Sequence, residues 1–257
     1  MPIVTGIEAF SQAMADYAND YVLIGGGACS ILFEHEGEVF RATKDLDIVV
    51  LADAATGGGF ARCFWDFIKQ GGYRCWKRSE GYAYYRFNLP ANSPDAGRLP
   101  GQIELFARRP DFVLEEEGSE VAPLPFDEGI SSLSAIILDD GYYEFIKANV
   151  SMAEGVPLLT TLHIIPLKMR AHVDLSRRHA EGLHVNQKDL VKHRSDVAKL
   201  SRLLRSDASL PLKGQMAQDA ALFFEDFESY IQRQTNRKVR AELEADLAVL
   251  REVYGLA

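Results

Sequence analysis

Residues 21–50 read YVLIGGGACSILFEHEGEVFRATKDLDIVV, and this stretch decides the fold. A short apolar run, YVLI, is followed at once by three glycines and by a segment, GGACSILFEHE, that is typical of a helix beginning at glycine. A second apolar run, DLDIVVLA, carries Asp45 and Asp47 at its start. The order predicts a buried strand, a glycine-started helix and a second strand that begins with acidic residues.

The spacing of the two aspartates places them on one face of the predicted strand. Successive side chains of a strand point to opposite faces, so Asp45 and Asp47 share a face while Leu46 and Ile48 belong to the core on the other. Carboxylates whose Cα atoms are about 6–7 Å apart repel each other unless a cation lies between them. Mg²⁺ fits, because it is typically held by one or two carboxylates together with substrate phosphates and water. Solvated acids at a strand end are the common explanation for an isolated Asp-x-Asp, and three neighbouring features weigh against it.

These features favour a metal and nucleotide site. Glycines at 25–27, between a strand and a helix start, let the backbone approach a phosphate, which the helix N-terminus attracts. Glu104 lies in another apolar strand, QIELF, where an unpaired buried acid is costly, and a metal shared with the two aspartates would remove that cost. Arg41 and Thr43 stand just upstream of Asp45, on the same extended face.

The composition of the 257 residues is that of an ordinary globular protein, with 47% hydrophobic and 25% charged residues. The net charge of -9 argues against a surface that binds long duplex DNA. Cys29, Cys63 and Cys75 form no CxxC pair, which predicts reduced thiols and no zinc site. The apolar runs are too short to span a bilayer and no secretory signal is visible, so we expect a cytoplasmic protein without a membrane partner.

Up to about residue 158 the chain alternates between helical and extended patterns. Helices are predicted around Phe10 and over TGGGFARCFWDFIKQGGY, and strands over YAYYRFNLP and GQIELFAR, with further β-like runs in SSLSAIILDD and YYEFIKANV. Asp53 would close the strand that starts at Asp45. The resulting order, αβαβαββ with a β-rich tail, predicts an α+β domain over residues 1–158, built on a small mixed sheet with flanking helices.

The pattern changes from about residue 159 onward. Helical periodicity recurs in TTLHIIPLKMRAHVDLSRRHAEG, NQKDLVKHRSDVAKLSRLLRS, LKGQMAQDAALFFEDFESYIQRQ and RKVRAELEADLAVLREVYG. Gly182, the SLPLKG turn and a TN dipeptide separate these segments. Residues 159–257 are therefore predicted to form a C-terminal helical bundle.

The N-terminal motifs resemble those of a known superfamily. The combination LIGGGACSIL…FRATKDLDIVV resembles the signature of the polymerase-β-type nucleotidyltransferases, and its GG-x-A…R-x-T-x-D-x-D form is similar to the AbiEii toxin type. The resemblance implies that Gly25 and Gly26 hold a triphosphate. It also implies that Asp45, Asp47 and Glu104 are the catalytic, metal-binding carboxylates. The chain departs from the family pattern in its third glycine, in the absence of a serine from the turn, and in a Glu where Asp is usual.

The resemblance continues into the helical half and covers roughly residues 20–200. IIPLKMRAHVDLSRR and KDLVKHRSDVAKL resemble the family's C-terminal elements. The resemblance implies that Lys168 neutralises phosphate charge and that Asp196 orients this lysine or binds the incoming substrate. Arg170 and Lys192 are secondary candidates. The nucleotide-binding set that follows is Gly25, Gly26, Gly27, Arg41, Thr43, Lys168, Arg170 and Lys192.

These residues predict a metal-dependent nucleotidyltransferase that moves an NMP from an NTP to an acceptor, with two Mg²⁺ ions, or Mn²⁺ in their place. The acceptor is left open between RNA such as a tRNA end, a protein hydroxyl and a small molecule. The resemblance suggests the toxin of a toxin–antitoxin or phage-defence pair, with a cognate antitoxin as partner. The alternatives are an antibiotic nucleotidyltransferase, a catalytically idle nucleotide- or partner-binding module on the same fold, and a purely structural protein.

Overall fold

The structure is a computed structural model that describes residues 4–51, 57–79, 83–107, 122–123, 139–183 and 185–256. The chain divides into two compact units. Unit 1 comprises Met1–Ile130 and Lys147–Thr160, and unit 2 comprises Ser131–Ile146 and Thr161–Ala257. The sequence pattern predicted a sheet domain that includes all residues up to 158, whereas the described residues 139–146 group with the C-terminal helices. Asp53 and most of SSLSAIILDD, residues 131–138, lie outside the described residues.

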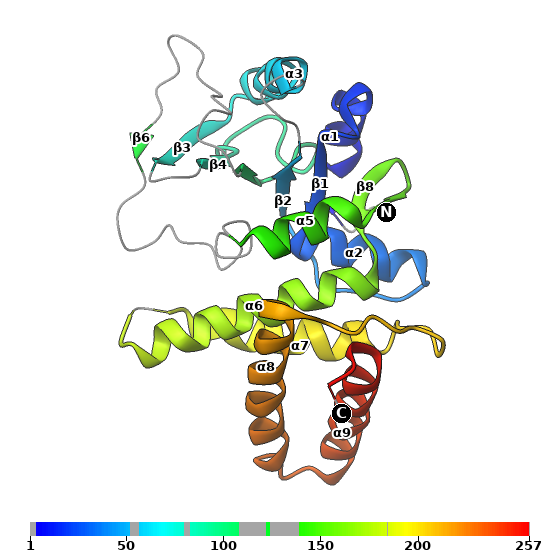
Figure 1. Cartoon of the computed structure of the whole chain (residues 1–257). Helices are drawn as coiled ribbons and strands as arrows, with labels where there is room; N and C mark the ends of the chain where they lie inside the picture. Colours follow the sequence, from blue (N-terminus) through cyan, green and yellow to red (C-terminus); the bar gives the residue numbers. More distant parts are fainter. Residues whose placement is uncertain are drawn as a thin grey trace. The chain divides into compact units, whose positions relative to one another are not determined.

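Unit 1 is built on a mixed sheet (Figure 1). Within the described residues the sheet has eight strands in the order β6-β3-β4-β5-β2-β1-β8-β7. β1 with β8, β2 with β5 and β3 with β6 are parallel pairs, and the other neighbours are antiparallel. The strand bounds are β1 (Tyr21–Ile24), β2 (Asp45–Val50), β3 (Arg74–Ser79), β4 (Ala83–Asn88), β5 (Gln102–Ala107), β6 (Ala122–Pro123), β7 (Val150–Ala153) and β8 (Val156–Leu159). The predicted α+β class is confirmed.

Aromatic side chains pack the helices of unit 1 onto the sheet. Phe10 makes edge contacts with Tyr21 of β1 and with Phe64, at ring-centroid distances of 5.5 and 6.3 Å. Small residues in the first half of the buried helix that follows β1, GGGACS, let its backbone approach β1 and β2 closely. The helices are α1 (Ile7–Ala13), the short 3-10 turn η1 (Ala15–Tyr17), α2 (Gly25–His35) and α3 (Gly57–Gln70).

One local prediction was wrong, and strands β3, β7 and β8 were not predicted. YYEFIKANV was predicted as extended, yet helix α5 spans Asp140–Ala148. Tyr142 and Ile146 are buried at helical spacing, and Asp139 Oδ1 accepts a hydrogen bond from the Tyr142 N–H at 3.0 Å, which caps the first turn. Aromatic and β-branched residues favour strands only where they pack on a sheet surface, and here they form the buried side of a helix. Strand β3 was missed because RCWKRS contains no continuous apolar run.

The four helices predicted for the C-terminal half are present. α6 packs against α7 and α8, and α8 packs against α9 (Figure 1). Asn186 and Asn236 cap two of these helices, since their side chains accept hydrogen bonds from the backbone N–H groups of Lys188 and Lys238. The bounds are α6 (Thr161–Ala180), α7 (Gln187–Ser201), α8 (Gly214–Gln232) and α9 (Arg237–Tyr254). Among the helices that the structure describes, none is long and apolar enough to cross a bilayer.

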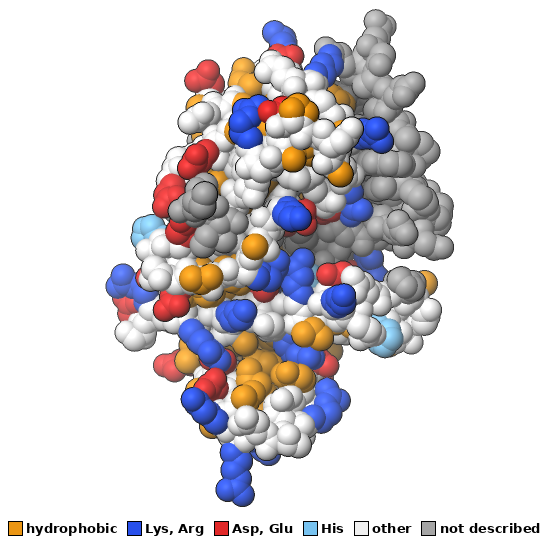
Figure 2. Space-filling model, turned by 180° about the vertical axis from the view of Figure 1, so that it is seen from behind, with side chains coloured by type: hydrophobic (Ala, Val, Ile, Leu, Met, Phe, Trp, Pro, Cys, Tyr) orange, Lys and Arg blue, Asp and Glu red, His pale blue; other side chains and the backbone are white. Residues whose placement is uncertain are grey.

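The surface of the described residues is mixed in character. On the face shown in Figure 2, Lys and Arg side chains lie among Asp and Glu side chains, and hydrophobic side chains gather over α8 and α9.

A buried histidine joins three helices of unit 2. The Nδ1 of His172 in α6 donates to the carbonyl oxygen of Leu190 in α7 at 3.1 Å, and its Nε2 lies 2.8 Å from Asp226 Oδ2 in α8. The hydrogen bond with His172 is the main cause that lowers the pKa of Asp226 below its ordinary value. Burial opposes this shift, while the charges of His172 and Arg194 add to it. Asp226 therefore stabilises unit 2 in its ionised form.

We predict that Asp226→Asn destabilises the protein at neutral pH and flattens its loss of stability in acid. The lowered folded pKa contributes stability that is present above the unfolded pKa of about 3.9 and is lost as the pH falls through the folded value. Because the Asp226 side chain is 39% exposed, solvent screening reduces the expected loss at neutral pH to about 0.5–1 kcal/mol. Urea unfolding of variant and wild type at neutral and acid pH measures both effects. The control is Asp207→Asn, at a fully exposed aspartate that also has a lowered pKa. An equal loss of stability in this control would contradict the stabilising role of ionised Asp226.

Candidate active site

Six polar side chains lie on one face of the unit 1 sheet in two rows. The pairings of β5 with β2 and with β4 place three of them opposite one another, and the other three two residues further along. Paired residues on neighbouring strands, about 4.8 Å apart, point to the same face. The first row is Asp45, Gln102 and Asn88, and the second row is Asp47, Glu104 and Arg86. Leu46 and Ile103, which alternate with these residues, are fully buried on the opposite face.

Glu104 in the second row is a buried carboxylate that is compensated within the sheet. It is 6% exposed. Its Oε1 accepts hydrogen bonds from Arg86 Nε at 3.0 Å and from Gln102 Nε2 at 3.0 Å, and Arg86 Nη2 lies 2.8 Å away. Arg86 therefore supplies the positive charge that was predicted to come from a metal ion. Glu104 Oε2 forms no hydrogen bond with a described residue.

The two aspartates fit a bound metal ion better than the set of three carboxylates does. Asp45 and Asp47 lie on the same face, and both are only partly buried. One or two carboxylates, completed by substrate phosphates, are the usual protein ligands of Mg²⁺. Within the described residues, no group of three His, Cys, Asp or Glu side chains is arranged to hold a metal ion. A three-carboxylate site that includes Glu104 and a magnesium-binding role for Asp45 and Asp47 therefore both stay predictions.

Gly25 brings the start of α2 against the Asp47 carboxylate. Antiparallel pairing of β1 with β2 sets Ile24 opposite Asp47, and Gly25 follows at once with a φ of +68°. A Cβ atom at Gly25 would lie 2.6 Å from Asp47 Cγ and would overlap its Oδ2. Only glycine satisfies both the left-handed backbone and this approach. The positive end of the helix dipole and the carboxylate thus occupy one small region, which favours binding of a metal-complexed phosphate.

The next two glycines have different surroundings. A Cβ atom at Gly26 would lie 3.1 Å from Arg41 Nη2 and 3.2 Å from Thr43 Oγ1, so these two predicted phosphate ligands contact the first turn of α2. A Cβ atom at Gly27 would instead lie 3.5 Å from Leu46 Cδ2 and from the Asp45 carbonyl oxygen. Gly27 therefore packs against β2. The structure brings Gly25, Gly26, Arg41 and Thr43 together near Asp47.

Two of the predicted residues of unit 2, Lys168 and Asp196, form a buried ion pair, whereas Lys192 is half-buried. Lys168 in α6 is 2% exposed, and its Nζ donates to Asp196 Oδ2 in α7 at 3.0 Å. The two alternative roles predicted for Asp196, orienting this lysine or binding the incoming substrate, stay predictions. Burial, followed by the charges of Lys168 and Lys192, holds the pKa of His193 well below its ordinary value. These surroundings favour the neutral form of His193.

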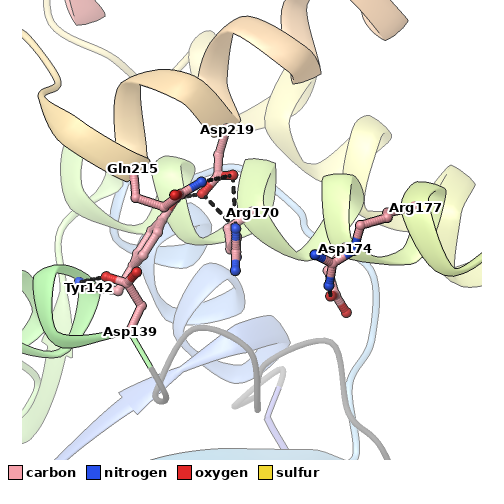
Figure 3. Close-up of polar contacts among 7 residues, drawn as sticks. All are labelled: Asp139, Tyr142, Arg170, Asp174, Arg177, Gln215 and Asp219. Carbon is pink, nitrogen blue, oxygen red and sulfur yellow. Dashed lines mark hydrogen bonds and ion pairs between the residues drawn. The ribbon is translucent and has the colours of Figure 1, made fainter.

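Arg170 is held by a second polar network of unit 2 (Figure 3). Its Nη1 donates to Asp219 in α8 at 2.9 and 3.1 Å, and Gln215 Nε2 donates to the same carboxylate at 3.0 Å. The Tyr142 hydroxyl of α5 donates to Asp219 Oδ2 at 2.9 Å. Burial, and then the Asp219 charge, raise the pKa of Tyr142, which keeps this hydroxyl a donor. The network explains why the α5 segment groups with the helices.

A pocket of about 610 Å³ opens beside the first row. Asp45, Gln102 and Asn88 contribute to its lining, together with Lys44 and with apolar residues of the loop that joins β4 to β5, such as Leu89 and Leu99. The loop is ordered by its own hydrogen bonds, including Ser93 N–H to the Pro90 carbonyl oxygen at 2.9 Å. The pocket is therefore preformed, as is usual for small-molecule sites.

Sequence reasoning missed the β4 contribution to this site. Arg86 and Asn88 occupy alternate positions of YRFN in an otherwise apolar strand. That alternation matches the spacing of Gln102 and Glu104 in β5, and it is the signal that could have revealed them. Only the strand pairing shows that the two patterns align.

A comparison with solved structures found one that is similar to this chain. The chain matches no protein-family model and no curated protein. It is similar to an antigenic nucleotidyltransferase-like protein from Paracoccidioides brasiliensis, with 17% sequence identity and a TM-score of 0.49. The likeness covers 96% of this chain and 93% of that chain. At this TM-score the likeness assigns neither a family nor a site to the protein.

We predict that Gly25→Ala disrupts the site. A non-glycine residue at a left-handed φ costs about 1–2 kcal/mol, and the added methyl group must also displace Asp47. Gly37→Ala is the matched control, since Gly37 has a φ of +73° but nothing within 4 Å of an added Cβ atom. Thermal unfolding should show a clearly larger loss for Gly25→Ala than for Gly37→Ala. Equal losses would show that the close approach to Asp47 is absent in solution.

We also predict that Arg86→Met destabilises unit 1 by about 1–3 kcal/mol, because it leaves the buried Glu104 carboxylate without its cation. The double variant Arg86→Met/Glu104→Leu should recover part of this loss, since it also removes the unpaired charge. The control is Arg98→Met, which breaks an exposed pair with Asp95 and should cost little. Urea unfolding of wild type, Arg86→Met, Glu104→Leu, the double variant and Arg98→Met measures the coupling between Arg86 and Glu104. Additive effects of the two substitutions would refute it.

Proposed function

We propose that this protein is a nucleotidyltransferase that transfers an NMP from an NTP to a hydroxyl group of an acceptor. The observation that supports this proposal best is the placement of Asp45 and Asp47 on one sheet face, with the first turn of α2 against Asp47. A pair of carboxylates beside a helix N-terminus joins the two requirements of the reaction, a site for a divalent cation and a site for phosphates.

In the proposed mechanism the first turn of α2 and Arg41 bind the phosphates of the NTP. Asp45 and Asp47 would hold Mg²⁺ or Mn²⁺, which would supply charge neutralisation at the α-phosphate and at the departing pyrophosphate. The acceptor oxygen forms a bond to the α-phosphorus while the bond to the bridging oxygen breaks and pyrophosphate leaves. Arg86 and Gln102 orient Glu104 through Oε1, and Oε2 receives the proton of the acceptor hydroxyl.

Arg86 bears on the number of metal ions that we propose. Two ions were predicted from the sequence, with Glu104 as a ligand. Since Arg86 already neutralises this carboxylate, we propose that the resting protein holds one ion, on Asp45 and Asp47. Phosphates of the bound NTP provide the ligands through which a second ion could enter.

The predicted roles of the unit 2 residues, of an RNA acceptor and of an antitoxin partner belong to this proposal, and no contact in the structure tests them. The roles implied for Lys168, Arg170, Lys192 and Asp196 in binding the nucleotide stay predictions. The same holds for a tRNA or other RNA acceptor, for the toxin role, and for a cognate antitoxin partner. Each rests on the sequence resemblance.

A nucleotide-binding module without transfer is the second candidate. The pairing of Glu104 with Arg86 favours it, because this contact withdraws one carboxylate oxygen from the chemistry. The two candidates differ in a single observable, which is the appearance of a labelled product.

We predict that Asp45→Asn abolishes NMP transfer and leaves the fold intact, because the amide no longer provides a charged metal ligand. The protein is incubated with NTPs labelled at the α-phosphate and, in separate reactions, with total RNA, a protein extract and a small-molecule extract. Label should enter one pool with wild type and with the exposed control Asp16→Asn, but not with Asp45→Asn. Transfer by Asp45→Asn at the wild-type rate would overturn the assignment. Binding of Mg-NTP with no label in any pool would identify the module instead.

A further inference from the structure

The pocket beside Asp45 contains hydrogen-bonding groups that the protein itself does not use. The half-buried Asn88 carboxamide forms no hydrogen bond with a described residue. Gln102 donates through Nε2 to Glu104, and its Oε1 accepts nothing from the described residues. Two amide groups in one wall of a preformed pocket provide donors and acceptors for a polar ligand.

The charges in the pocket lining indicate a neutral ligand. Lys44 and Asp45 are the charged residues among those that line it, and their charges are opposite. A polynucleotide requires several cations along its backbone, which this lining does not provide. Leu89, Pro90 and Leu99 supply apolar walls against which the face of a ring can pack. A volume of about 610 Å³ suits a molecule of one or two rings.

The position of the pocket relative to the phosphate-binding turn indicates which substrate it holds. Gly25, Gly26 and Arg41 lie on the β1 side of β2, whereas the pocket lies on the β5 and β4 side. In phosphoryl transfer the attacking and leaving oxygens lie roughly in line on opposite sides of the phosphorus. If pyrophosphate leaves on the β1 side, the acceptor must approach from the β5 side, where the pocket opens.

We propose that this pocket binds the acceptor, and that the acceptor is a neutral ring compound bearing several hydroxyl groups, of the size of a ribonucleoside or a monosaccharide. The proposal rests on the nucleotidyltransferase function proposed above. Asn88 and Gln102 are the specificity-determining residues, since their amides hydrogen-bond the ring substituents. Asp45 is shared between this pocket and the metal-binding pair, so the acceptor hydroxyl lies next to the reacting phosphate.

Binding to the full chain tests the pocket separately from transfer. The probes are adenosine, cytidine, glucose and a short RNA oligonucleotide, and saturation-transfer NMR measures the binding of each. Binding of Mg-ATP is measured in a parallel titration. Ala91→Trp fills the pocket from its exposed rim, and Asn92→Trp adds the same side chain at the next loop residue, which does not line it. Asn88→Leu removes an amide without adding bulk and serves as the second variant.

We expect at least one of the nucleosides or glucose to bind the wild type and Asn92→Trp equally, and to bind Ala91→Trp and Asn88→Leu at least about tenfold more weakly. Binding of Mg-ATP should be the same in all four proteins. Loss of Mg-ATP binding in Ala91→Trp would mean that the pocket holds the base of the NTP, and would overturn the proposal. The proposal would also be overturned if the oligonucleotide were the sole probe that binds, or if none of the probes binds.

The α-labelled NTP assay separates failure of this inference from failure of the proposed function. A probe that binds through the pocket and becomes labelled supports both. If a probe binds as expected while no pool is labelled, the pocket remains a small-molecule site, but its acceptor role and the nucleotidyltransferase proposal are refuted. If labelled RNA appears and Ala91→Trp does not reduce it, the transferase proposal stands and the small-acceptor inference is refuted.

Discussion

The register of β2 between β1 and β5 is the constraint on which the rest of the candidate site depends. Antiparallel pairing with β1 sets Ile24 opposite Asp47, so that α2 starts beside the Asp47 carboxylate. Parallel pairing with β5 sets Glu104 next to the same aspartate. A slip of one residue would turn both aspartates of β2 into the core, where unpaired carboxylates are costly. The apolar residues on the other face of β2 thus maintain the geometry of the acids.

Charge compensation inside the sheet connects this register with the chemistry. Arg86 from β4 neutralises Glu104, which lets a buried acid exist in the second row without a metal ion. Asp45 and Asp47, on the same face, are only partly buried. Unit 2 uses the same principle, since the buried Lys168 is paired with Asp196. In each unit, buried charged residues are paired with residues on neighbouring elements.

The sequence-based predictions were correct for features that depend on neighbouring residues, and they failed for features that depend on contacts with distant residues. The strand, glycine and helix order of residues 21–50 was confirmed, because alternation and glycine conformation act within a few residues. The helix α5 was predicted as a strand, because its aromatic residues are stabilised by contacts with distant elements, such as the bond from Tyr142 to Asp219. The short, mostly polar β3 was missed because its partner β4, and not its own pattern, makes it a strand.

The sequence by itself determined that Asp45 and Asp47 share a strand face and that glycine stands where α2 begins, since both follow from backbone periodicity and sterics. Only the tertiary structure decided which side chains surround them. It placed Arg86 on Glu104, packed Gly27 against Leu46, and opened a pocket between Asp45 and the loop after β4. These arrangements depend on the pairing of strands that are far apart in the chain, and no local pattern encodes the register of such a pair.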